Sequence, residues 1–189
     1  KLKHIKLMKF DIAIRKGCQE LKKNNISSAL LDSEILLSRA INKERKFILL
    51  NLDQELNSDD QDNFKNLIKK RSRGVPIAYL TGTKSFWKFD FKVNNKVLIP
   101  RPETEVIIEQ VLKIYKNKDN LNFLEVGIGS GCIILSLLKE KKYFLGTGID
   151  LSEDCIRICK YNAANLGVNS RLRLIKSNVD NLNFGKYDL

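Results

Sequence analysis

The chain has 189 residues, of which 43% are hydrophobic and 30% are charged, as in a soluble protein with one domain or two small ones. It contains no apolar run of roughly 18 residues or more and no apolar stretch near its basic start, which argues against a transmembrane helix and a secretory signal. The net charge of +12 favours anionic partners, although lysines spread over solvated faces give the same total. No run of basic residues is interleaved with aromatic residues, as single-strand binders require, so we expect no direct nucleic-acid binding.

The four cysteines do not have the spacing of a metal site. Cys155 and Cys159 are four residues apart in an expected helix, Cys18 and Cys132 are distant, and the one histidine, His4, is near the start. A structural metal site needs more ligands at close spacing. We therefore expect no metal, and four reduced thiols in a cytoplasmic protein.

The first part of the chain has the apolar spacing of helices. Four segments place apolar residues on one helical side: 9–25, 28–41, 43–50 and 58–73. Ser58 is the expected N-cap of the last helix, Gly74 is expected to end it, and Pro76 is expected to prevent a restart. Residues 1–73 are thus predicted to form a small helical bundle.

The next part of the chain has the composition of strands. Residues 78–97 are rich in aromatic and β-branched side chains, and the alternation of Phe89, Phe91 and Val93 predicts a hairpin. Residues 98–102 should be extended, because each proline disfavours helix in the residue before it. Pro102 is then expected to open a helix over residues 103–115. We interpret residues 74–100 as a hairpin linker.

From residue 122 onward, strands and helices alternate. The expected strands are 123–126, 143–149 and 171–176, with a fourth beginning at 187–189, and the expected helices are 132–141 and 153–166. Such alternation predicts an α/β fold with a mostly parallel, doubly wound sheet. Three strands and a stub leave a sheet edge open, so we expect the natural protein to continue.

The strongest chemical signal is a glycine loop between a strand and a helix. It runs from Glu125 to Gly131, and Asp150 ends the next strand. Glycines let the backbone approach a ligand, and a carboxylate at the end of that strand can accept both ribose hydroxyl hydrogens. The third glycine comes one residue earlier than in dinucleotide folds, with Cys132 in its place, so a nucleotide or a purely structural turn is a weaker reading.

The pattern E-x-G-x-G-x-G resembles motif I of class I methyltransferases, a Rossmann-like family that binds S-adenosyl-L-methionine. In that family a residue after the third strand bonds the adenine amino group. This position is often aspartate in the family, and in this sequence it is Asn178. The side-chain carbonyl oxygen of Asn178 can accept the same hydrogen bond from the adenine amino group. The resemblance implies a cofactor site formed by Glu125, Val126, Gly127, Ile128, Gly129, Gly131, Asp150, Leu151, Asn178 and Val179, with Arg101 and Thr104 bordering it.

Four further segments resemble the release factor glutamine methyltransferase family (HemK/PrmC). They are LDSEILL at 31–37, RSRGVPIAYLTG at 71–82, the F-W-x-x-x-F pattern of the hairpin, and LIPRPETE at 98–105. The resemblance implies a helical substrate-recognition domain at 1–73, the linker at 74–100, and the N-terminal part of a methyltransferase domain at 101–189.

The resemblance also implies a reaction and a partner. The glutamine amide in the Gly-Gly-Gln motif of a peptide chain release factor receives the methyl group. The family's N-P-P-Y motif, which binds that amide, would follow Leu189, so no catalytic residue is assigned and residues 1–189 alone are expected to be inactive. We expect a monomer with no membrane partner. The alternatives are a methyltransferase for nucleic acid or another protein, and a docking module without catalysis.

Overall fold

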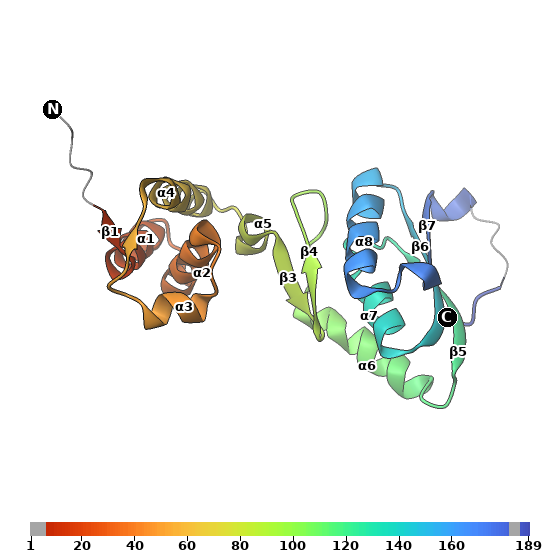
Figure 1. The fold of residues 1–189 in the computed structure, drawn as a ribbon. Coiled ribbons are helices and arrows are strands. Elements are labelled where there is room, and N and C mark those ends of the chain that lie inside the picture. Colours follow the sequence, from red (N-terminus) through yellow and green to blue (C-terminus); the bar gives the residue numbers. More distant parts are fainter. Residues whose placement is uncertain (1–6, 182–185) are drawn as a thin grey trace. The chain divides into compact units, whose positions relative to one another are not determined.

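A computed structural model describes residues 7–181 and 186–189 of the chain, which divides into two compact units, Lys1–Thr81 and Gly82–Leu189 (Figure 1). None of the helices in the described residues is long and apolar enough to cross a membrane. Because the first unit ends at Thr81, it extends beyond residue 73, where the helical bundle was expected to end.

The first unit is a helical bundle. Its helices are α1 (Phe10–Lys23), α2 (Ala29–Ile41), α3 (Arg45–Leu50), α4 (Ser58–Ser72) and α5 (Ile77–Thr81), and β1 (Met8–Lys9) pairs antiparallel with β2 (Glu55–Leu56). Apolar side chains from α1, α2, α3 and α4 meet in one core, which includes Phe10, Leu21, Leu36, Leu37, Ile48 and Phe64. The four predicted helices are confirmed, because their apolar stripes are the faces that build this core.

Two details at the ends of α4 differ from the prediction. The N-cap is Asn57, whose side chain accepts a hydrogen bond from the Asp60 N–H at 2.8 Å, so Ser58 is the first helical residue rather than the cap. Pro76 opens a helix instead of preventing one, since its carbonyl accepts from the N–H groups of Tyr79 and Leu80. A proline fits there because the first turn of a helix leaves its N–H groups unbonded.

A buried ion pair connects α2 and α4. Arg71 Nε donates to Asp32 Oδ2 at 2.7 Å, and an Arg71 Nη1 hydrogen bonds the Val75 carbonyl at 3.2 Å. Asp32 is only 3% exposed and also accepts from Ser28 Oγ. Asp32 and Arg71 belong to two separate signature segments, and the structure joins them by a buried charge pair.

The second unit begins with a hairpin of β3 (Thr83–Phe86) and β4 (Phe89–Lys92). The predicted hairpin is confirmed for these residues, while 77–81 are helical. The two-residue turn places Trp87 at φ 56°, a left-handed conformation that a bulky residue rarely adopts. Two glutamates hold it there: the Trp87 N–H donates to Glu105 at 2.8 Å and the indole Nε1–H donates to Glu140 at 2.7 Å.

The rest of the second unit is a parallel sheet with helices, as predicted. Strands β5 (Asn120–Val126), β6 (Tyr143–Asp150) and β7 (Leu172–Lys176) lie in the order β5-β6-β7. Helices α7 (Cys132–Glu140) and α8 (Glu153–Leu166) pack on β6, and α8 also contacts β7 (Figure 1). Helix α6 (Glu105–Ile114) follows a short 3-10 turn, η1 (Pro102–Thr104), so the predicted helix at 103–115 starts with this turn.

The last residues of the chain lie along β5. The Leu124 N–H donates to the Leu189 carbonyl at 2.9 Å, and the Asp188 N–H donates to the Asn122 carbonyl at 2.8 Å. These two bonds place residues 188–189 at the edge of β5 that does not face β6. Residues 187–189, where a fourth strand was expected to begin, are not assigned to a strand, so β5 is the edge strand of the order β5-β6-β7. The carboxyl ends of the three parallel strands lie on the same side of the sheet.

Candidate functional site

The loop from β5 to α7 turns on glycines with left-handed backbone. Gly127, Gly129 and Gly131 have φ values of 76°, 53° and 80°, where any other residue would be strained. The N–H groups of Gly127 and Ile128 both donate to the Ile149 carbonyl, at 2.8 and 3.2 Å. The loop is therefore folded back onto the end of β6, beside Asp150.

Asp150 connects this loop to the start of α8. Its Oδ2 accepts from the Gly129 N–H at 3.0 Å, and its Oδ1 accepts from the Ser152 N–H at 2.9 Å. An ionised carboxylate has about four lone-pair sites, so both oxygens keep capacity for a ligand hydroxyl. The fold thus orients Asp150 as an acceptor at the carboxyl end of β6.

Glu125 lies in a different environment from Asp150. Its Oε2 accepts from the Ile134 N–H at 2.8 Å, in the first turn of α7. Burial of the carboxyl group raises the pKa of Glu125 to about 8; the Ile134 hydrogen bond acts against this rise, and the charge of Asp150 adds to it. Glu125 is therefore mainly protonated at neutral pH, and its carboxyl ties β5 to α7.

A cavity of about 260 Å³ opens at the carboxyl ends of the strands. It is lined by Val126, Gly127, Ile149, Asp150, Leu151, Ser177, Asn178 and Val179. Three of these are unusually exposed for apolar residues, with Val126 at 55%, Leu151 at 70% and Val179 at 46%. An apolar surface around one carboxylate suits a ligand that combines a flat ring with hydroxyl groups.

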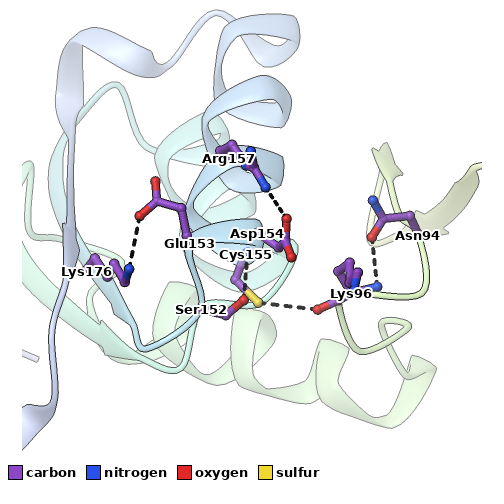
Figure 2. Close-up of polar contacts among 8 residues, drawn as sticks. All are labelled: Asn94, Lys96, Ser152, Glu153, Asp154, Cys155, Arg157 and Lys176. Atoms are coloured by element: carbon purple, nitrogen blue, oxygen red, sulfur yellow. Dashed lines mark hydrogen bonds and ion pairs between the residues drawn. The ribbon is translucent and has the colours of Figure 1, made fainter.

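Figure 2 shows the polar contacts of the first turn of α8, which follows the lining residues Asp150 and Leu151 in the chain. The Cys155 N–H donates to Ser152 Oγ at 3.4 Å, and Glu153 pairs with Lys176 of β7 at 3.5 Å. The Cys155 thiol contacts the carbonyl of Lys96 at 3.7 Å. The turn that follows Asp150 is thus held both to β7 and to the segment after the hairpin.

The structure brings together most of the predicted cofactor residues. Glu125, Ile128, Gly129 and Gly131 build the loop, and the cavity is lined by Val126, Gly127, Asp150, Leu151, Asn178 and Val179. Arg101, just before the η1 turn, and Thr104, at its end, do not line it. Asn178 is exposed and exchanges hydrogen bonds with Asp180, at 3.3 and 3.4 Å.

Two residues that line the cavity, Ile149 and Ser177, were not among the residues predicted from the sequence. Each lies next to a predicted site residue at a strand end, and the rule that parallel sheets bind ligands at their carboxyl edge could have indicated both. A larger cavity of about 670 Å³ lies in the first unit, between α1 and α4. It contains neither the glycine loop nor Asp150, so we place the candidate site at the smaller cavity.

The described residues contain no group of three or more His, Cys, Asp or Glu side chains arranged to hold a metal ion. His4 lies outside them. The four cysteines are free thiols. Burial raises the pKa of the Cys132 thiol to about 12, with the nearby Glu125 adding to this, so the thiol is neutral at physiological pH.

Comparison with known proteins gives matches along most of the chain. Residues 13–82 match the family described as PrmC N-terminal domain. A "Bifunctional methyltransferase" of Rickettsia conorii is 37% identical over 89% of this chain and 37% of its own length. A "Release factor glutamine methyltransferase" of Caulobacter vibrioides is 36% identical over 82% of this chain and 54% of its own length.

The chain thus spans about half, or less, of the length of these curated relatives. Among solved structures, a SAM-dependent methyltransferase from Geobacter sulfurreducens in complex with S-adenosyl-L-homocysteine is 27% identical and covers 41% of this chain and 29% of its own, with a TM-score of 0.35. The family match and the curated relatives confirm that the chain resembles the release factor glutamine methyltransferases, with a PrmC N-terminal domain match followed by an α/β unit.

Proposed function

We propose that the chain binds S-adenosyl-L-methionine at the glycine loop and, within the complete protein, methylates the glutamine amide in the Gly-Gly-Gln motif of peptide chain release factors. One observation carries the proposal: the glycine loop, Asp150 and an apolar-rimmed cavity meet at the carboxyl edge of a parallel sheet. The curated relatives named as release factor glutamine methyltransferases support the choice of substrate.

The residues of the cavity fit this cofactor. The Asp150 carboxylate can accept both ribose hydroxyls, and the exposed side chains of Leu151 and Val179 offer apolar surface to the adenine ring. The Asn178 carbonyl oxygen can accept from the adenine amino group, in exchange for its weak bond to Asp180. The narrow loop at Gly127 leaves its backbone open to the methionine portion of the cofactor.

When bound, the cofactor supplies a methyl group activated by a sulfonium. The amide nitrogen of glutamine is a poor nucleophile, because its lone pair is delocalised into the carbonyl. Rate enhancement must therefore come from holding the amide in line with the methyl–sulfur bond. In this proposal the described residues hold the cofactor, the reactant that carries the methyl–sulfur bond. The glycine loop does so, and hydrogen bonds to Asp150 and Ile149 fix its conformation.

We assign substrate recognition to the first unit, which the PrmC N-terminal domain match covers from residue 13 to its end. Its charge is +7 by count, from 17 Lys and Arg against 10 Asp and Glu in residues 1–81. A basic unit favours an approach to partners that act on the anionic ribosome. In this assignment the first unit binds the release factor and the second unit binds the cofactor.

The proposal is tested by methyl transfer from isotope-labelled cofactor to a purified release factor, using the full-length protein. We expect one methyl group on the peptide that contains the Gly-Gly-Gln motif, found by mass spectrometry. A release factor with that glutamine changed to alanine should accept no label. Label on another residue, or on nucleic acid added in its place, would refute the substrate assignment while leaving the cofactor site intact.

A further inference from the structure

Asn162, in the middle of α8, makes three hydrogen bonds from a position that is 1% exposed. Its Nδ2 donates to the Ser130 carbonyl at 2.9 Å and to the Lys92 carbonyl at 3.1 Å. Its Oδ1 accepts from the Lys92 N–H at 2.8 Å. Both amide hydrogens and the amide oxygen are therefore engaged, each with main chain.

The two partners of Asn162 belong to different functional segments. Ser130 lies in the glycine loop, between the left-handed Gly129 and Gly131. Lys92 is the last residue of β4, and the Asn162 amide pairs with both of its main-chain groups as a neighbouring strand would. One buried side chain thus links the loop to the hairpin.

The glycine loop is held from two sides at consecutive residues. Asp150 accepts from the Gly129 N–H, and Asn162 donates to the Ser130 carbonyl. Glycines on both sides of Ser130 make this backbone intrinsically free, so its conformation depends on such external bonds. Without Asn162, the buried Ser130 carbonyl would lose this donor, which is unfavourable and would favour a rearranged loop.

We propose that Asn162 is a positioning residue for the cofactor site: it fixes the peptide between Ser130 and Gly131 in the ligand-binding conformation and couples the glycine loop to β4. This inference rests on the proposed cofactor function. Asn162 does not line the cavity, so its effect on affinity is transmitted through the Ser130 main chain.

The test is the affinity for S-adenosylhomocysteine, measured by calorimetry on the full-length protein. Asn162→Asp has the same size and keeps the acceptor for the Lys92 N–H, but it removes both donors. The matched control is Ile158→Ala, one turn earlier on the same face of α8, where a buried side chain is shortened without loss of a bond to the loop. We expect Asn162→Asp to weaken binding about tenfold or more, and Ile158→Ala to remain within about twofold of wild type.

A second measurement separates positioning from simple loss of stability. In ¹⁵N-labelled protein, Asn162→Asp should shift the amide resonances of Gly129 and Gly131, and Ile158→Ala should not. If Asn162→Asp does not fold, Asn162→Ser, which keeps one donor, should show a smaller loss of affinity and the same resonances shifted. Equal affinity of the Asn162 variants and the control would overturn the inference. If wild type itself does not bind, the proposed cofactor site fails, and this inference with it.

Discussion

At the scale of single residues, Glu125 and Asp150 show how one site gives two carboxyl groups different roles. Asp150 accepts two main-chain N–H groups and faces the cavity, whereas Glu125 is held under the loop by the Ile134 N–H. The glycine motif in the sequence predicted both positions. It could not predict that Glu125 is mainly protonated, because that depends on burial by residues far away in the chain.

Glu125 makes stability depend on pH. Its pKa rises from 4.5 to about 8 on folding, so the unfolded chain loses this proton at lower pH than the folded chain does. Its contribution to the free energy of unfolding is thus lost as pH rises from about 4.5 to about 8. Glu125→Gln has no proton to lose, so its stability relative to wild type should increase over this window, by up to about 5 kcal/mol for a shift of this size, and level off above it.

Urea unfolding at several pH values measures this difference. Trp87, the one tryptophan in the sequence, lies in the same unit as Glu125 and reports its unfolding by fluorescence. The exposed Glu109, changed to Gln, is the matched control and should leave the pH dependence as in wild type. A constant difference between Glu125→Gln and wild type from pH 5 to pH 8 would show that Glu125 ionises in the folded protein as it does in the unfolded chain.

At the scale of elements, apolar periodicity predicted the long helices and the three sheet strands, because burial selects one face of each. It failed for α5, which is only Ile77–Thr81, since five residues are too few for a period to show. Pro76 was read as a barrier although it opens that helix. The conformation of Trp87 was also not predictable, because the partners that hold it, Glu105 and Glu140, come from α6 and α7.

The turn of the hairpin gives a prediction about Trp87. Trp87→Gly removes the backbone strain of a left-handed tryptophan, a gain of about 1 kcal/mol. It also removes a ring that packs on the core and donates to Glu140, a loss of about 3 kcal/mol or more. We expect a net destabilisation of the second unit by about 2 kcal/mol, measured by circular dichroism. Lys88→Gly, at the other turn position, should cost less than about 1 kcal/mol. A more stable Trp87→Gly protein would mean that strain outweighs the indole contacts.

The buried ion pair between α2 and α4 gives a further prediction. Arg71→Ala leaves Asp32 buried without its cation, which should cost the first unit about 3 kcal/mol. Arg15→Ala breaks an exposed pair with Asp11 and should cost less than about 1 kcal/mol. Hydrogen exchange of peptides from α2 and α4 measures both. Equal protection in the two variants would show that the Asp32–Arg71 pair contributes no more than a surface contact.

At the scale of the whole molecule, the sequence predicted a helical part followed by an α/β part, because the period of the apolar pattern changes between them. The structure divides the chain at 81/82, later than predicted, since α5 packs on α2 and α4. Motif spacing located the loop, Asp150 and Asn178, which follow strand ends. It did not locate Asn162, whose partners are 32 and 70 residues away along the chain.

We propose that the carboxyl ends of the sheet strands hold the cofactor. The most direct measurement is calorimetric binding of S-adenosylhomocysteine to wild type, Asp150→Ala and Asp154→Ala. Asp154 is a matched control, because it is an aspartate four residues later, in the first turn of α8, and contacts Arg157 instead of the loop. We predict binding by wild type and Asp154→Ala, and affinity at least about tenfold weaker in Asp150→Ala. No binding by wild type, or equal affinity in all three proteins, would contradict a cofactor site at Asp150.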